Sequence, residues 1–224
     1  MKKLLLLKAA VTSSRAVLGD YELWFQRGLG DVSLHVVEAH AGEPWPSVRE
    51  FDGVVVTGSP KSVTCAEPWM QRVADAMVEA GDASRGVLGV CFGHQLLAWR
   101  HGATVQTSPR GRELGTVTVS LTDRGRESPL FDGFPVSFEV QSTHYDEVVT
   151  HASLDVLATS AWCGVHAFQV KPRVYGVQFH PEMDAASIRF CMAAAETTDA
   201  ERSRAQACAT PWGTRLLQRF VELC

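Results

Sequence analysis

Apolar positions divide the first half of the chain into two kinds of segment. Short apolar runs have the length and composition of buried β-strands: residues 4–7, 32–37, 53–57 and 86–90. Between them, apolar residues recur every three or four positions over 20–29 and 68–81, which is the spacing of one helix face. Strands that alternate with helices in this way are typical of an α/β domain with a mainly parallel sheet.

From residue 114 onward the pattern changes. Polar and apolar positions alternate strictly over 116–121, as in a half-buried antiparallel strand. Further strand-like segments follow, the last two forming a predicted hairpin: residues 136–140, 147–149, 165–170 and 174–179. We therefore expect an antiparallel portion to be added to the parallel sheet. Helical spacing predicts closing helices over 185–195 and 212–223, and the polar stretch 196–210 between them predicts a loop.

The composition is that of an ordinary globular protein. Of 224 residues, 46% are hydrophobic and 21% are charged, and the formal net charge is -4 without any basic block. The charge pattern excludes a nucleic-acid footprint, and the lack of an apolar run of about 18 residues excludes a membrane span. Lys8 interrupts the first apolar run too early for a signal peptide. We therefore expect a cytoplasmic protein.

The six cysteines lie far apart, without the paired spacing that binds zinc. This pattern fits a reducing compartment, and we expect neither a metal nor an organic cofactor. One of them, Cys91, stands in the sequence Gly-Val-Cys-Phe-Gly at a predicted strand-to-helix junction. A nucleophile on such an elbow needs small residues two positions before and after it, and the positive end of a helix favours a thiolate. The alternative is a buried structural cysteine beside a tight turn.

A second group of residues stands at the end of the strand predicted over 174–179. His180 follows this strand, and Glu182 lies two positions further on, where side chains return to the same side. A carboxylate there can accept the imidazole N–H and leave the other ring nitrogen free to act on a thiol. We expect Cys91, His180 and Glu182 to form a triad; the alternative is a surface turn after a strand. Other histidines have no partner pattern and are expected to be structural or exposed: His35, His40, His101, His151 and His166.

Gly58 begins a Gly-Ser-Pro turn directly after the strand predicted over 53–57. In a parallel sheet, sites form beyond the carboxyl ends of the strands, which is where Gly58, Cys91 and His180 arrive. The backbone N–H groups of Gly58 and Phe92 are therefore expected to bind an oxyanion. Because these segments are far apart in the sequence and meet in one site, we predict that residues 1–224 form a single domain.

Three blocks of the sequence resemble the signatures of class I (triad-type) glutamine amidotransferases. They are Val-Val-Thr-Gly-Ser-Pro (55–60), Gly-Val-Cys-Phe-Gly-His-Gln-Leu-Leu-Ala (89–98) and Gly-Val-Gln-Phe-His-Pro-Glu (176–182). The match continues through 111–115 and 144–148 and covers nearly the whole chain. Within the family, the chain is most similar to stand-alone, GMP-synthetase-like members, a group that grades into the γ-glutamyl peptidases. The resemblance implies a three-layer, flavodoxin-like α/β fold, with a mainly parallel central sheet and an antiparallel portion in the C-terminal half.

The resemblance also implies roles for the triad residues. Cys91 would attack the side-chain amide of glutamine, or another γ-glutamyl amide, to give a γ-glutamyl thioester. His180 would protonate the leaving ammonia or amine and then activate the hydrolytic water, with Glu182 orienting the ring. The backbone N–H groups of Gly58 and Phe92 would form the oxyanion hole.

Binding of the substrate is implied at two further places. Gln95 matches the family position that contacts the amino-acid end of the substrate, and the segment of Ser142, Thr143 and His144 matches the region whose backbone holds it. His144 and Asp146 also fit the family pattern, and a turn held for structure is at least as good an interpretation of that pair.

Three hypotheses about function follow from the sequence. The first is an amidotransferase subunit that hydrolyses glutamine and passes ammonia to a separate synthetase; the signature blocks favour it. The second is a self-contained γ-glutamyl hydrolase that acts on γ-glutamyl peptides or conjugates. The third is a degenerate amidotransferase fold retained as a binding module, against which the intact Cys91, His180 and Glu182 argue.

Overall fold

Among residues 1–195 and 206–224, which the computed structural model describes, nine strands form one sheet in the order β2-β1-β3-β4-β11-β10-β9-β6-β7. Five neighbouring strands are parallel: β2 (Val32–Val37), β1 (Lys2–Leu7), β3 (Gly53–Val56), β4 (Gly86–Val90) and β11 (Val174–Val177). Antiparallel strands continue the sheet: β10 (Ala167–Lys171), β9 (Asp155–Ser160), β6 (Glu113–Leu121) and β7 (Ser137–His144). A separate pair consists of β5 (Val105–Thr107) and β8 (Asp146–Val148).

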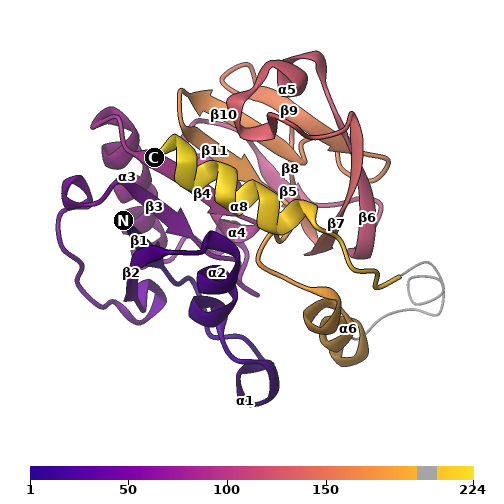
Figure 1. Ribbon diagram of the computed structural model, residues 1–224, viewed down its shortest axis with the longest axis horizontal. Helices are drawn as coiled ribbons and strands as arrows, with labels where there is room; N and C mark the ends of the chain where they lie inside the picture. The colour runs from indigo at the N-terminus through magenta and orange to yellow at the C-terminus, as the bar shows by residue number, and fades with distance from the viewer. Residues whose placement is uncertain (196–205) are drawn as a thin grey trace.

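The parallel part of the sheet is apolar on both faces. On β1, Leu5 and Leu7 belong to one core and Leu4 and Leu6 to the other, because successive strand residues point to opposite sides. Helices α3 (Pro68–Asp82) and α4 (Phe92–Arg100) cover the first face, whereas α2 (Tyr21–Leu29) and α8 (Trp212–Leu223) cover the second (Figure 1). The three-layer α/β fold is therefore confirmed.

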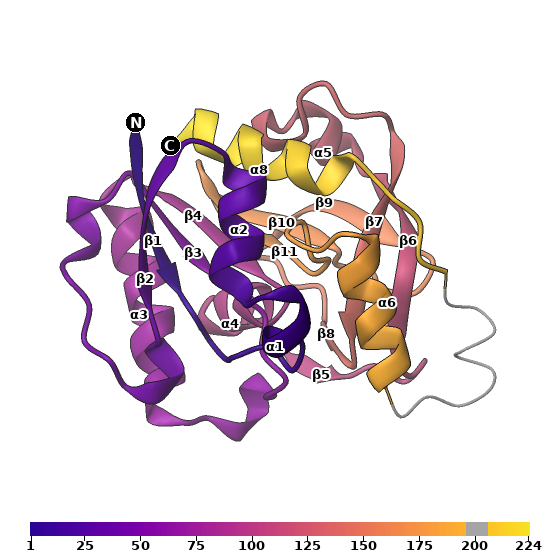
Figure 2. The same cartoon turned by 60° about the horizontal axis from the view of Figure 1, so that its bottom comes forward.

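Shorter elements complete the described chain. Helix α6 (Ala185–Ala194) lies beside β6 and β7 (Figure 2). The remaining helices and 3-10 turns are α1 (Arg15–Leu18), α5 (Asp123–Glu127), Ala39–Ala41, Val48–Glu50, Val63–Cys65 and Pro129–Phe131. Among the described helices, none combines the length and the hydropathy needed to cross a membrane.

The hydrophobic pattern located the parallel strands and their helices to within a few residues, but the antiparallel half needs corrections. Strand β9 was not predicted, because only two of its six residues are fully buried and no regular alternation marks it. Strand β7 continues to His144, beyond the predicted end at residue 140. Of the predicted loop 196–210, residues 196–205 lie outside the described part, and 206–210 have no regular secondary structure.

Close packing joins the first and last parts of the chain. A Cβ on Gly28 would lie 2.3 Å from Leu217 Cδ1, so glycine allows α2 and α8 to approach each other. The two termini also lie close together (Figure 1).

Phe220 tests this packing, since its side chain is fully buried beneath α8. Phe220→Ala removes buried apolar surface and leaves a cavity, so we expect the free energy of unfolding in urea to fall by about 3–5 kcal/mol. Gln218→Ala, at an exposed position of the same helix, should change it by less than about 0.5 kcal/mol. Equal losses in the two variants would contradict the described packing of α8.

Candidate active site

Cys91 stands between β4 and α4 with backbone angles that few side chains adopt. Its φ of 51° and ψ of -99° lie outside the helical and extended regions, which is a strained conformation for a residue with a Cβ. A Cβ on Gly89 would lie 2.4 Å from the Gly93 carbonyl oxygen, and one on Gly93 would lie 2.6 Å from the Val56 carbonyl oxygen. The turn therefore needs glycine on both sides of Cys91, and it puts the thiol at the positive end of α4.

His180 follows β11, the strand next to β4 in the sheet. Its Nδ1 lies 2.7 Å from Glu182 Oε1, and both side chains are buried. Burial opposes a charge on the imidazole, but the neighbouring Glu182 and Cys91 outweigh that effect and hold the pKa of His180 well above its ordinary value. The structure thus brings Cys91, His180 and Glu182 together from two adjacent parallel strands.

Gly58 follows β3, the other neighbour of β4. A Cβ at this position would lie 2.8 Å from His180 Cε1, so glycine leaves the space that the imidazole ring occupies. Within the described part of the chain, the Gly58 N–H donates no hydrogen bond to another backbone group. Phe92 is the first residue of α4, where backbone N–H groups have no partner inside the helix. Both N–H groups are therefore available to a ligand oxygen.

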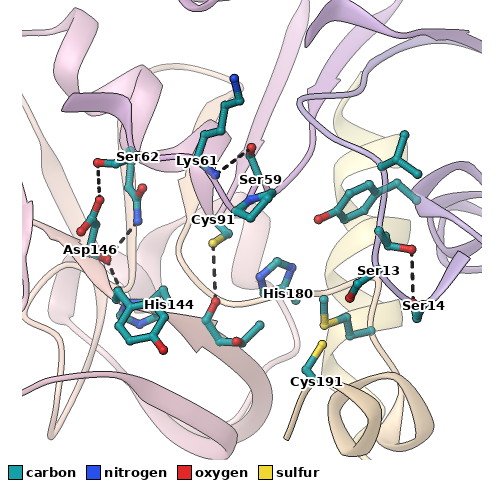
Figure 3. Close-up of a pocket in the computed structure, with 18 of the residues that line it drawn as sticks. Ser13, Ser14, Ser59, Lys61, Ser62, Cys91, His144, Asp146, His180 and Cys191 are labelled. Atoms are coloured by element: carbon teal, nitrogen blue, oxygen red, sulfur yellow. Dashed lines mark hydrogen bonds between the residues drawn. The ribbon is translucent and has the colours of Figure 1, made fainter. Parts of the chain in front are cut away.

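A cavity of about 530 Å³ opens beside these residues. Cys91 and His180 lie next to each other on its wall (Figure 3). Gln95, Thr143 and His144 also line it, and the Thr143 carbonyl oxygen is 3.9 Å from Cys91 Sγ. The side chain of Ser142 lies elsewhere, because its hydroxyl donates to the buried carboxylate of Glu113.

The turn that contains His144 and Asp146 is tied to α4 by Gln95. Gln95 Nε2 donates to the Asp146 carbonyl oxygen at 2.9 Å, and His144 Nδ1 lies 2.9 Å from the same oxygen (Figure 3). The Asp146 carboxylate accepts hydrogen bonds from Ser62 and Thr107. These contacts give the His144 and Asp146 pair a structural role in shaping the cavity wall.

Behind His144, a buried carboxylate gathers four side chains. Glu113 Oε2 lies 2.9 Å from His144 Nε2 and 2.7 Å from His166 Nε2. The same oxygen accepts a hydrogen bond from the Ser142 hydroxyl, and the other carboxylate oxygen, Oε1, accepts one from the Ser160 hydroxyl. Burial raises the pKa of Glu113, but His166 and His144 outweigh it and hold that pKa well below its ordinary range. His166, expected to be structural or exposed, is therefore a buried structural residue.

In the described part of the chain, one group of side chains has the donor atoms that could hold a metal ion. It consists of Glu113, His144 and His166, whose possible ligand atoms lie within 4.8 Å of one another. The 2.7 and 2.9 Å separations are hydrogen-bond lengths. Both carboxylate oxygens already accept hydrogen bonds. Hydrogen bonding therefore explains the cluster without an ion.

Part of the cavity wall was not anticipated from the sequence. These residues are Val11, Thr12, Ser13, Ser14, Tyr21, Trp24, Lys61, Ser62, Arg112, Tyr145, Met183 and Cys191. Arg112 and Tyr145 lie inside the stretches 111–115 and 144–148, which match the amidotransferase pattern, and that match was the available signal. The segment 11–14 precedes α1 and carries no motif that marks it.

Comparison with known proteins identifies a family. Residues 26–188 match the family model for glutamine amidotransferase class-I. The crystal structure of a glutamine amido transferase from Methylobacillus flagellatus has the same fold, with a TM-score of 0.77 over 99% of this chain and 94% of that one, at 21% identity.

The curated relatives of this chain include glutamine-hydrolyzing GMP synthases and gamma-glutamyl peptidases. A glutamine-hydrolyzing GMP synthase subunit of Methanospirillum hungatei is 31% identical over 168 residues, which cover 74% of this chain and 82% of that protein. Gamma-glutamyl peptidase 4 of Arabidopsis thaliana is 29% identical over 191 residues, covering 81% and 76%. GMP synthase of Aeropyrum pernix is 39% identical over 132 residues, or 58% of this chain, and the match spans only 24% of that longer protein.

Glu113 gives a pH-dependent test of the buried cluster. Because its pKa is lower in the folded than in the unfolded chain, its charge stabilises the fold above the ordinary carboxyl pKa of about 4.3, and this contribution is lost progressively as the pH falls below that value. We expect Glu113→Gln to unfold at lower urea concentration than the wild type at neutral pH, and the difference to shrink between roughly pH 5 and pH 3. The exposed control Glu127→Gln should show no such trend. A difference that stays constant over this range would rule out the assigned ionisation.

Proposed function

The chain belongs to the class-I glutamine amidotransferase family, and on this basis we propose that it is a cysteine-dependent hydrolase of γ-glutamyl amides. Its simplest substrate is glutamine, whose γ-amide it cleaves to glutamate and ammonia. The observation that carries the proposal is Cys91, strained at the N-cap position of α4, beside the buried His180 and Glu182 pair at one cavity. A cavity that only bound a ligand would not need an imidazole placed between a thiol and a carboxylate.

In the first half of the reaction, a thioester forms. His180 takes the proton of the Cys91 thiol, and the sulfur attacks the γ-carbonyl carbon. Negative charge develops on the carbonyl oxygen, where the N–H groups of Gly58 and Phe92 stabilise it. His180 then gives its proton to the amide nitrogen, the C–N bond breaks, and ammonia or an amine leaves.

In the second half, water takes the place of the leaving group. His180 accepts a proton as water attacks the thioester carbon; the C–S bond then breaks and the proton returns to the sulfur of Cys91. Glu182 supports both halves, because its contact with Nδ1 fixes the ring and leaves Nε2 free. The raised pKa of His180 fits a ring that must hold a proton between the two transfers.

The amino-acid end of the substrate lies, in this proposal, against Gln95, Thr143 and His144. These residues line the cavity beside Cys91. The side chain of Ser142 is turned toward Glu113, so any contribution of this residue comes from its backbone.

Two observations bear on what else the enzyme uses. The cavity of about 530 Å³ is larger than a single amino acid needs, which favours γ-glutamyl peptides or conjugates as further substrates. Val11 and Tyr145, which line the cavity, remain 38% and 50% exposed. Exposed apolar groups at this opening favour a contact with a separate synthetase subunit that would accept the ammonia.

All six cysteines are free, which fits a protein that works in the reducing cytoplasm.

Cys91→Ser should abolish hydrolysis. We expect kcat/KM for the working substrate to fall by at least about 10³-fold, since the hydroxyl is a far weaker nucleophile than the thiolate. Cys65→Ser removes an exposed thiol outside the cavity and should leave kcat/KM unchanged. Wild-type rates in the Cys91 variant would refute the mechanism.

The substrate is tested with the purified protein alone, given glutamine in one reaction and a γ-glutamyl dipeptide in another. We expect glutamate to be released from glutamine. Rapid cleavage of the dipeptide with negligible release of ammonia from glutamine would contradict the glutaminase assignment and establish the peptidase alternative. Silence on both substrates would contradict the stand-alone reaction and point to a required partner.

A further inference from the structure

Arg112 lines the cavity but has no part in the mechanism described above. It lies immediately before β6, and its guanidinium carbon sits 4.8 Å from the centre of the Tyr145 ring. Its Nη2 donates to Thr143 Oγ1 at 2.7 Å, and its Nη1 donates to the Tyr145 hydroxyl at 3.4 Å. The Thr143 carbonyl oxygen is in turn 3.9 Å from Cys91 Sγ. The guanidinium is therefore held beside the residue that touches the nucleophile.

Charges around the cavity leave this guanidinium without a counter-ion. Lys61, which with Arg112 makes up the lysine and arginine side chains on the wall, pairs with Glu67. The carboxylate of Asp146 accepts hydrogen bonds from two hydroxyl groups. In the described part of the chain, Arg112 forms no salt bridge, and its Nε is buried without a hydrogen-bond partner. A partly buried charge of this kind calls for an anion.

The chemistry of the group selects the anion. A guanidinium presents a planar fork of N–H donors that matches a carboxylate with two parallel hydrogen bonds. Stacking on Tyr145 and the bond to Thr143 fix the plane of that fork in advance. We propose that Arg112 binds a carboxylate of the substrate and thereby determines which γ-glutamyl compounds the enzyme accepts. The inference rests on the proposed function, because it supposes that the substrate occupies this cavity.

A γ-glutamyl dipeptide offers two such carboxylates. One is the α-carboxylate of the glutamyl group, which glutamine shares, and the other belongs to the leaving amino acid. In the first case Arg112 recognises every γ-glutamyl substrate, and in the second it favours peptides over glutamine. Removal of each carboxylate in turn from the ligand distinguishes the two sources.

Binding without turnover provides the test. Calorimetry on Cys91→Ser is carried out with γ-glutamylglycine, with γ-glutamylglycinamide, which lacks the leaving-group carboxylate, and with 4-aminobutyrylglycine, which lacks the α-carboxylate. Adding Arg112→Met should weaken the binding of γ-glutamylglycine roughly tenfold to a hundredfold, as expected for loss of a charged hydrogen-bonded pair. One of the two analogues lacks the carboxylate that Arg112 binds, and Arg112→Met should leave the affinity for that analogue unchanged. This result identifies which carboxylate Arg112 binds.

Further variants keep the test interpretable. Arg112→Lys retains the charge but not the fork, so it should bind γ-glutamylglycine with intermediate affinity. Arg110 lies in the same loop, but its guanidinium is outside the cavity and donates to the carbonyl oxygens of residues 161 and 162. Arg110→Met should therefore leave the affinity for γ-glutamylglycine unchanged. The inference would be overturned if Arg112→Met weakened the binding of all three ligands equally or of none of them. It would also be overturned if γ-glutamylglycine did not bind when Arg112 is present.

Failure of this inference is distinct from failure of the proposed function. If the wild type hydrolyses γ-glutamyl amides but Arg112→Met binds all ligands as before, the function stands and the role of Arg112 falls. If the ligands show the expected dependence on Arg112 while the wild type hydrolyses none of them, the carboxylate site stands and the hydrolase proposal falls.

Discussion

The backbone of Cys91 is the constraint on which the site depends. A residue with a Cβ is held at a φ of 51° because β4 turns directly into α4, and the close contacts of Gly89 and Gly93 leave no room for other residues. The buried strand on one side and the helix on the other keep the turn from relaxing. The neighbours of β4 then complete the arrangement: β3 ends at Gly58 and β11 leads to His180, so the parallel sheet order itself brings three chemically useful groups to one edge.

The antiparallel half of the sheet has a different task. It adds β6 and β7, whose ends supply Arg112, Thr143 and His144 to the cavity wall. Glu113 anchors this wall from behind by binding side chains from three segments, and its ionised state is stabilised by the two histidines. The parallel half thus carries the proposed chemistry, and the antiparallel half shapes the space in which a substrate would lie.

Local sequence patterns predicted the parallel half well, because buried strands and amphipathic helices show their periods within a few residues. The Cys91 elbow and the His180 and Glu182 pair were also visible, since each is set by residues adjacent in sequence. The link between Glu113 and His166 was not, because 53 positions separate two residues whose spacing obeys no rule. Ser142 and Thr143 illustrate a finer limit. They are consecutive in one strand and so point to opposite faces, and only Thr143 reaches the cavity.

The central claim is that Cys91 carries the glutamyl group during the reaction. It is tested most directly by acid quenching of the wild-type protein during turnover of a γ-glutamyl substrate, followed by mass spectrometry of its peptides. The account predicts that the peptide containing Cys91 gains the mass of one glutamyl group, and that this adduct disappears when the substrate is exhausted. Product formation while Cys91 remains unmodified and the adduct sits on another cysteine would contradict it.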